Sequence, residues 1–218
     1  MTPPVKPITA PRMAVRTAVI LFLFVVIFTA MLSGAYLWTL PSIEAAAAEE
    51  KMKLVDEVLP RDRYDNKLLG DFATIEKAEG LGLDEPARIY RARKGGKLEA
   101  LILEAVAPDG YAGKIRLLLA LAADGQIIGV RAISHKETPG LGDYIEPKKD
   151  RDKEHPWIAQ FNGLSPSAAE EKDWKVKKDG GRFDSVAGAT VTPRAVIKAV
   201  RKATLFVDAN REKILASQ

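Results

Sequence analysis

The sequence predicts an α+β fold, with a single N-terminal transmembrane helix followed by one domain that has an antiparallel sheet and a packed C-terminal helix. Three observations favour this class. Residues 17–43 contain no charged residue, residues 88–134 contain four apolar runs separated by turn residues, and residues 192–207 repeat apolar side chains at helical spacing. A chain of 218 residues is long enough for one globular core beside a membrane segment.

The first predicted element is a membrane span at residues 17–40, which consists largely of Ile, Leu, Phe, Val and Ala. At about 1.5 Å per residue, a helix of this length crosses a hydrocarbon core of roughly 30 Å. The alternative is a cleaved signal peptide that ends near the small residues 45–47. Its apolar region would exceed the roughly 7–15 residues typical of such peptides.

The charges that flank the span predict its orientation. The charged residues before the span are all basic: Lys6, Arg12 and Arg16. The first charged residues after it are acidic: Glu44, Glu49 and Glu50. Positive charge favours the cytoplasmic side of a bilayer. We therefore expect a cytoplasmic tail at residues 1–16 in the inner membrane and a domain on the periplasmic or extracytoplasmic side.

Residues 41–60 predict a helical stalk. Ser42 is a candidate N-cap after Pro41, and an alanine-rich helix continues to about Val58, where Leu59 and Pro60 end it. The domain proper is then expected at residues 61–218.

The sheet is predicted from β-rich apolar runs at 88–93, 98–106, 115–122 and 127–134, with a short strand near 72–75. Turn signals separate the four main runs: Gly95 and Gly96, then 108–110, then Asp124 and Gly125. They predict an antiparallel meander. The run at 115–122 is apolar enough for a helix, but the Asp-Gly turn directly after it favours a strand.

After the sheet, residues 135–156 predict a solvated loop, and Trp157, Ile158 and Phe161 predict a short helix that returns to the core. A strand is expected near 174–177. The C-terminal helix is the best-defined element, because Thr192 is a candidate cap, Pro193 suits the first helical position, and apolar residues recur afterwards. Those residues are Val196, Ala199, Val200, Ala203 and Val207.

Composition excludes several function classes. The chain has no cysteine, which excludes disulfides, thiolate zinc sites and Cys-ligated iron–sulfur clusters. The net charge is +4, but three of the 33 basic residues lie within residues 1–43, which leaves 30 basic and 29 acidic residues from residue 44 onward. No nucleic-acid partner is expected from a domain so nearly neutral. Neither a metal cluster nor a hydrolase motif is visible.

The most informative segment is 187–190, Ala-Gly-Ala-Thr, immediately before a predicted helix start. Unpaired N–H groups and the helix dipole at such a start favour an anion such as phosphate. Together with Asp184, the segment resembles the flavinylation motif Asp-x-x-(Ser/Thr)-Gly-Ala-(Ser/Thr). In that motif the last hydroxyl, here Thr190, forms a phosphoester with FMN.

A second segment, 135–143, is similar to a loop of FMN-binding domains in the RnfG and NqrC families. The resemblance implies that Glu137 and Thr138 help to hold the isoalloxazine or ribityl chain, that Leu141 covers a ring face, and that glycines give backbone contacts. The glycines that give these contacts are Gly140 and Gly142. Gly188 and Ala189 belong to the phosphoester motif. No catalytic residue is expected.

The two motifs together resemble RnfG, the G subunit of Rnf-type complexes. The resemblance implies an electron carrier with covalent FMN, in a complex that couples ferredoxin and NAD electron transfer to ion translocation. It also implies a flavin transferase, which uses FAD and a divalent metal, and membrane-subunit partners. Two alternatives remain: an NqrC-like subunit of a sodium-pumping quinone reductase, and a non-redox assembly or sensor module, for which Ala187 at the motif's Ser/Thr position is the supporting feature.

Other conspicuous residues have structural interpretations. His135 has only His155 as another imidazole in the chain, so a hydrogen-bonded structural role is expected, with a position next to the flavin as the alternative. Trp157 and Trp174 are expected in the core, although either could flank a flavin ring.

Overall fold

The computed structural model describes residues 10–165 and 170–216. The chain divides into two compact units, Met1–Glu50 and Lys51–Gln218. Helix α1 spans Ala10–Val58 and supplies every described residue of the first unit. Residues 1–9 of the expected cytoplasmic tail lie outside the described residues.

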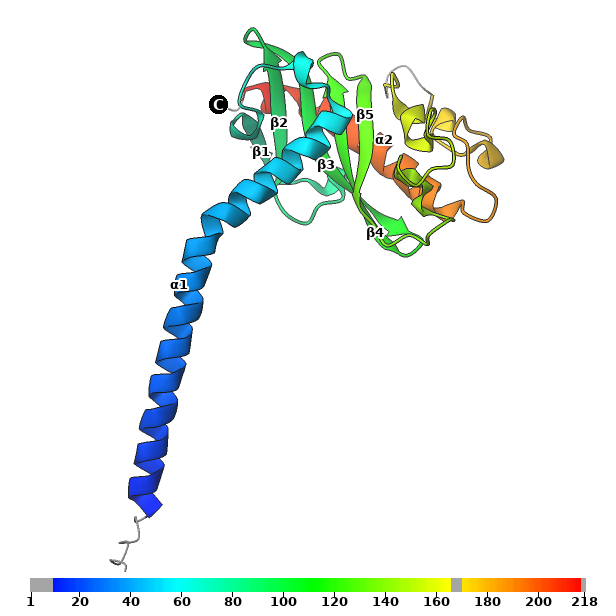
Figure 1. The fold of residues 1–218 in the computed structure, drawn as a ribbon. Coiled ribbons are helices and arrows are strands. Elements are labelled where there is room, and N and C mark those ends of the chain that lie inside the picture. Colours follow the sequence, from blue (N-terminus) through cyan, green and yellow to red (C-terminus); the bar gives the residue numbers. More distant parts are fainter. Residues whose placement is uncertain (1–9, 166–169, 217–218) are drawn as a thin grey trace, which may run out of the picture. The chain divides into compact units, whose positions relative to one another are not determined.

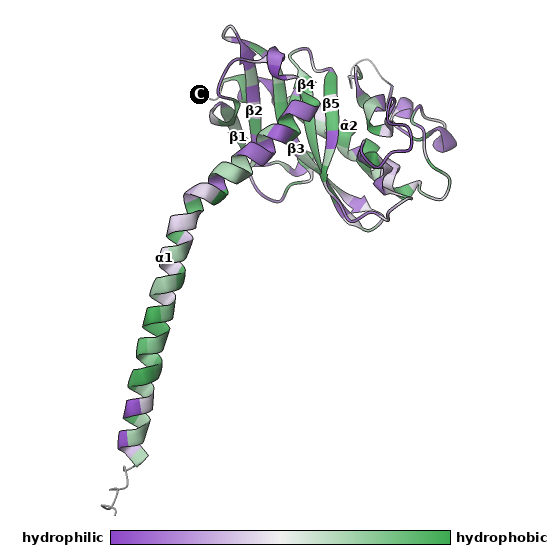
Figure 2. Cartoon of the chain, viewed as in Figure 1, coloured by the Kyte–Doolittle hydropathy of each residue, from purple (hydrophilic) through white to green (hydrophobic). Residues whose placement is uncertain are grey.

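In the first unit, the middle of α1 is apolar (Figure 2), and its large apolar side chains are exposed. Its most apolar window has a mean hydropathy of 2.6 and contains no buried residue. The helix is therefore long and apolar enough to span a membrane. It also runs through Pro41, so the prediction that Ser42 caps a separate stalk helix is wrong. Proline removes one backbone donor from a helix, and here the neighbouring turns continue without it.

The second unit contains one antiparallel five-stranded sheet (Figure 1). Its strands are β1 (Phe72–Ile75), β2 (Ala87–Lys94), β3 (Lys97–Gly110), β4 (Gly113–Ala122) and β5 (Ile127–Ser134), in the spatial order β1-β2-β3-β4-β5. The predicted fold class and meander are confirmed, and residues 115–122 form a strand. The β3–β4 hairpin is longer than expected, because β3 continues through a register shift between Ala107 and Gly110.

The sheet is buried on both faces, which explains the continuous leucine run. Leu117, Leu119 and Leu121 belong to one core cluster, whereas Leu118 and Ala120 belong to a second. Successive side chains of a strand point to opposite faces, so a strand covered on both sides is apolar at every position.

Helix α2 (Val191–Ala216) covers the face of the sheet that carries Leu117, Leu119 and Leu121, and it packs mainly against β3 (Figure 1). The five apolar positions expected to face the core are all buried. The helix begins at Val191, so Thr192 lies inside its first turn and the prediction that it caps the helix is wrong.

The end of α1 covers the opposite face of the sheet, which carries Leu118 and Ala120. Val55 and Val58 are buried there in one cluster with Tyr90 and Ile102 of the sheet. The predicted helix end at Val58 is confirmed. A Cβ at Gly129 of β5 would lie 2.7 Å from the Val58 carbonyl oxygen, so only glycine permits this close approach.

Short 3₁₀ helices complete the unit: Arg61–Arg63, Leu68–Gly70, Glu79–Leu81, Asp143–Ile145, Trp157–Phe161, Glu171–Asp173 and Lys177–Asp179. The helix predicted near Trp157 is confirmed in this form. The strand predicted near 174–177 is wrong, because the segment forms only an isolated bridge between Val176 and Phe183. Trp157 and Trp174 are both buried in the core, as expected.

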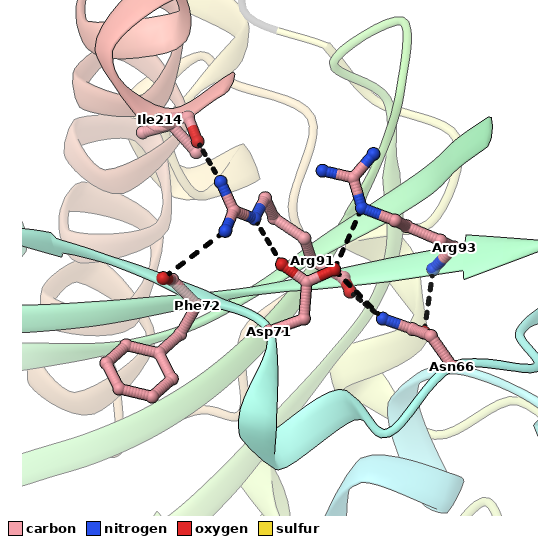
Figure 3. Close-up of polar contacts among 6 residues, drawn as sticks. All are labelled: Asn66, Asp71, Phe72, Arg91, Arg93 and Ile214. Atoms are coloured by element: carbon pink, nitrogen blue, oxygen red, sulfur yellow. Dashed lines mark hydrogen bonds and ion pairs between the residues drawn. The ribbon is translucent and has the colours of Figure 1, made fainter. Parts of the chain in front are cut away.

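A polar network fastens the C-terminal end of α2 to the edge of the sheet (Figure 3). The Nε of Arg91 lies 2.6 Å from a carboxylate oxygen of Asp71, and its Nη1 donates to the Ile214 carbonyl at 3.2 Å. Arg93 contacts the other Asp71 oxygen at 2.8 Å. Arg91 is only 5% exposed, so this pairing satisfies a buried charge.

Candidate functional site

A pocket of about 210 Å³ opens where three segments meet: the β3–β4 turn, the loop after β5, and the start of α2. Its wall is formed by Tyr111, Glu137, Thr138, Leu141, Gly142, Gly188, Ala189, Val191 and Thr192. The two sequence motifs, more than 40 residues apart in the chain, therefore form one site.

Glu137 connects all three segments. Its side chain is buried, with the whole residue only 4% exposed. One carboxyl oxygen accepts the Ala112 N–H of the hairpin turn at 3.0 Å. The other accepts a hydrogen bond from the Thr192 hydroxyl on α2. Both carboxyl oxygens are thus engaged by protein groups, and Glu137 holds the pocket wall together.

The loop after Glu137 forms a tight turn that presents Leu141. The Thr138 carbonyl accepts the N–H groups of Leu141 at 3.1 Å and Gly142 at 3.0 Å. Asp143, itself buried, accepts the Gly140 N–H at 2.8 Å. Gly140 has φ +76°, a left-handed conformation that favours glycine. Leu141 remains 46% exposed at the mouth of the pocket.

Gly142 is required for a different reason, which is space. Its φ of −97° suits any residue. A Cβ there would lie 2.8 Å from the Thr192 hydroxyl oxygen and 2.9 Å from a Glu137 carboxyl oxygen. The absence of a side chain at Gly142 therefore permits the Glu137–Thr192 contact.

The segment 184–190 reaches the pocket through a turn at Gly188, which has φ +84° and open space where a Cβ would lie. The Ala189 N–H donates to the Val186 carbonyl at 3.0 Å. The Ala189 carbonyl accepts the Tyr144 hydroxyl at 3.4 Å. These contacts fix the backbone that leads directly into α2.

Thr190 is the last residue before α2 and is partly exposed. Its side chain is not part of the pocket wall, whereas its neighbours Ala189 and Val191 are. A group bonded to the Thr190 oxygen thus begins beside the pocket at a helix N-terminus, where backbone N–H groups favour negative charge.

Asp184 is held by its backbone and exposes its carboxylate. Its carbonyl accepts the Trp157 indole N–H at 2.7 Å, and its N–H donates to Gln160 at 2.9 Å. The carboxylate lies 2.6 Å from the Lys177 ammonium, and 61% of its side-chain surface is exposed. Asp184 and Gly140 both lie outside the pocket wall.

Tyr144 contacts the segment 184–190 through its hydroxyl. Its ring packs edge-on against Trp157, with centroids 5.5 Å apart. Burial raises the pKa of its phenol to about 12, so the hydroxyl keeps the proton that it donates toward Ala189 at neutral pH.

His135 is hydrogen-bonded within the protein, as expected. Its Nδ1 accepts the Glu137 N–H at 3.1 Å, which helps to orient that residue. Its Nε2 lies 2.7 Å from a Glu146 carboxylate oxygen, at ion-pair distance but without the alignment of a good hydrogen bond. Among the residues that the structure describes, no cluster of metal-ligating side chains is present.

The structure adds three wall residues that sequence reasoning missed. Tyr111 lies in the β3–β4 turn. The sequence signal that could have revealed it is an aromatic residue directly after the turn residues Asp109 and Gly110. Val191 and Thr192 lie in the first turn of α2, and helical spacing alone did not reveal which residues of this helix line the pocket.

Comparison with known proteins assigns this site to a family. The FMN-binding domain family matches residues 110–204, a range that contains the whole pocket wall. The G subunit of the ion-translocating oxidoreductase complex of Pseudomonas aeruginosa is 44% identical over 207 residues, which cover 95% of this chain and 94% of that protein. The chain belongs to the RnfG family. This membership confirms the resemblance that the two motifs indicated.

Two further RnfG family members cover almost the whole chain, and both carry the same name as the Pseudomonas protein. The Shewanella loihica protein is 39% identical over 204 residues, 94% of each chain. The Aliivibrio fischeri protein is 36% identical over 200 residues, which cover 92% of this chain and 93% of that protein. The likeness therefore includes the apolar N-terminal helix as well as the FMN-binding domain.

The residues of the pocket suit FMN. Its volume is below the roughly 300–1,000 Å³ that encloses a whole drug-sized ligand, so it has room for only part of the molecule. In the second unit, five large apolar side chains are markedly exposed among the described residues, and three of them, Tyr111, Leu141 and Val191, line this pocket. An apolar, planar ring system is what such a rim favours.

Proposed function

We propose that this RnfG family member carries FMN as a phosphoester on Thr190 and transfers electrons within an Rnf-type membrane complex. The observation that carries the proposal is the position of Thr190. The last hydroxyl of the flavinylation motif lies at the N-terminus of α2, directly beside an apolar pocket lined by the second motif.

Attachment would require a flavin transferase, because a threonine hydroxyl is a poor nucleophile unaided. The Thr190 oxygen would form a bond to the phosphorus of the FMN half of FAD as the pyrophosphate bond breaks. AMP would leave and the hydroxyl proton would pass to a base of the transferase. The exposed carboxylate of Asp184 is suited to recognition by that enzyme.

The chain's own residues would bind and orient the flavin. Leu141 and Tyr111 offer apolar surface to the ring, and Thr138 offers a hydroxyl to the ring edge or the ribityl chain. Gly140, Gly142 and Gly188 shape the backbone around it. When bound, FMN would supply the capacity to accept and donate electrons.

The proposed partners are the other membrane subunits of the complex. Relatives carry the name of an ion-translocating oxidoreductase complex, and the family resemblance implies coupling between ferredoxin and NAD. This chain would carry electrons between neighbouring subunits and would not catalyse the overall reaction alone. The relatives favour this assignment over an NqrC-like subunit.

The proposed topology keeps residues 1–16 in the cytoplasm, 17–40 in the membrane, a helical stalk at 41–60 and the domain at 61–218 in the periplasm. The absence of cysteine makes this testable by single-cysteine labelling. Asp84, whose side chain is 92% exposed, would be labelled by an impermeant maleimide in spheroplasts as Asp84→Cys, whereas Thr2→Cys would not. The opposite pattern would contradict the orientation.

The test of the flavin proposal is the intact mass of the full-length chain, denatured after coexpression with or without a flavin transferase. We expect an FMN-sized increment only with the transferase. Flavin that is lost on denaturation would instead favour the non-redox module, for which Ala187 at the Ser/Thr position of the motif is the supporting feature.

A further inference from the structure

Arg194 lies one helical turn beyond Thr190 and contacts it twice. Its Nη1 is 3.5 Å from the Thr190 hydroxyl oxygen. Its backbone N–H donates to the Thr190 carbonyl at 3.4 Å. The guanidinium group therefore offers a charged donor to the oxygen that would carry the phosphate.

Asp179 fixes the direction in which this guanidinium points. Its two carboxylate oxygens accept from Nε and Nη2 of Arg194 at 2.7 and 2.8 Å. A bidentate pair of this kind holds the planar fork in one orientation. Nη1, the nitrogen that the pair leaves available, faces Thr190.

The surroundings of this pair are positively charged. Lys175 and Arg194 line a surface hollow together with Asp179, Trp174 and Ile197. The pKa of Asp179 is lowered, first by its hydrogen bond from Arg194 and further by the charges of Arg194, Lys178 and Lys175. One carboxylate thus faces three cations, which leaves positive charge available for an anion.

We propose that Arg194 is a positioning residue that pairs with the phosphate of FMN at Thr190, and that Asp179 orients it for this contact. The inference rests on the proposed covalent flavin. Its chemical target is the negatively charged oxygen of the phosphodiester, because a guanidinium N–H and a phosphate oxygen form a strong charge-assisted hydrogen bond.

The chain offers a matched control on the same helix. Arg201 forms an ion pair with Glu171 at 3.1 Å, and its side chain is likewise partly exposed. Arg201→Gln removes the same charge from α2 at a distance from Thr190. Any effect of charge loss alone should therefore appear in both Arg194→Gln and Arg201→Gln.

The first experiment measures the initial rate at which a flavin transferase, given FAD and Mg²⁺, attaches flavin to the full-length chain in detergent. We expect Arg194→Gln to slow attachment about five- to tenfold, and Arg201→Gln to leave the rate unchanged. Equal rates for the two variants would overturn the inference alone. A wild-type chain that gains no flavin would instead overturn the proposed function.

The second experiment separates phosphate pairing from a contact with the transferase or a loss of structure. A Thr190→Ala chain is titrated with FMN and with riboflavin, which lacks the phosphate. We expect FMN to bind more tightly, and Arg194→Gln in that background to reduce the ratio of the two affinities about five- to tenfold without changing riboflavin binding. An unchanged ratio, equal weakening of both ligands, or no preference for FMN would overturn the pairing.

Discussion

The Thr192 hydroxyl donates a hydrogen bond to the buried carboxyl group of Glu137, across 55 residues of sequence. This single contact joins the loop after β5 to the start of α2. Because Thr190 lies two residues before Thr192, the same contact sets the position of the proposed attachment oxygen relative to the pocket. The other carboxyl oxygen of Glu137 accepts the Ala112 N–H, which joins the β3–β4 hairpin turn to the same site.

Glu137→Ala should reduce the free energy of unfolding by about 2–3 kcal/mol, because it leaves the Ala112 N–H and the Thr192 hydroxyl without their acceptor. Thr192→Val, which is nearly isosteric, should cost about 1–2 kcal/mol. Urea unfolding of the full-length chain in detergent, followed by tryptophan fluorescence, would measure both. In the double variant the losses should be less than additive.

Glu154→Ala, in the exposed part of the same loop, is the control and should leave stability unchanged. Fully additive losses at Glu137 and Thr192 would contradict the contact.

Gly142→Ala and Gly140→Ala should differ in kind. The first places a methyl group against Glu137 and Thr192, so we expect it to disrupt the pocket and to lower flavin occupancy severalfold. The second has open space but a left-handed backbone, so it should cost only about 1 kcal/mol of stability. Flavin absorbance per chain and thermal melts would separate these effects. Greater loss of flavin in Gly140→Ala would contradict this account.

Tyr144 should contribute a pH-dependent part of the stability. An unfolded tyrosine ionises near pH 10, whereas the pKa of folded Tyr144 is raised to about 12. Between those values the unfolded state binds fewer protons than the folded state, so the free energy of unfolding falls as pH rises. The contribution is fully present below about pH 10 and is lost through about pH 12.

Tyr144→Phe should therefore lose less stability than the wild type between pH 9 and about 11.5, a difference that urea titrations at both pH values would measure. Identical pH dependence in the two proteins would contradict a buried, protonated phenol.

Arg91→Ala should destabilise the second unit by about 3 kcal/mol, because it removes the buried partner of Asp71 and the donor to Ile214. Arg88→Ala on the same strand is the control: Arg88 is exposed and its guanidinium lies 5.1 Å from the centroid of the Phe72 ring, so its loss should cost only about 0.5–1 kcal/mol. Similar melting temperatures for the two variants would argue against the network in Figure 3 as a stabilising contact.

Most of the sheet could be predicted from sequence because its signals are local. Gly95 and Gly96 both adopt positive φ in the β2–β3 turn, and Gly125 does so between β4 and β5, as turn glycines do. The leucines of β4 were ambiguous only because the sheet is covered on both faces, a fact that no local pattern contains.

The errors arose where tertiary contacts decide the structure. The segment around 174–177 forms no strand in a sheet and pairs only with the backbone near Phe183, whose N–H donates to the Lys175 carbonyl at 3.1 Å and whose carbonyl accepts the Lys177 N–H at 2.7 Å. Thr192 has the side chain of a helix cap, yet it bonds to Glu137 instead. Both outcomes depend on residues that are distant in sequence or on backbone proximity, which spacing does not reveal.

The two family motifs predicted six of the nine residues that line the pocket. That Glu137 helps to hold the flavin stays a prediction, and the structure adds that its carboxyl oxygens accept hydrogen bonds from Ala112 and Thr192. Tyr111, which carries no motif, has the most exposed side chain of the wall's large apolar residues.

The most direct test of the central claim is to find the residue that carries the flavin. After digestion with trypsin, the peptide 183–194 contains Ser185, Thr190 and Thr192, so tandem mass spectrometry of the flavinylated chain can distinguish the three hydroxyls. The account predicts FMN on Thr190 alone, lost in Thr190→Ala and retained in Thr192→Val. Flavin on Ser185 or Thr192, or a Thr190→Ala chain that still carries covalent flavin, would contradict it.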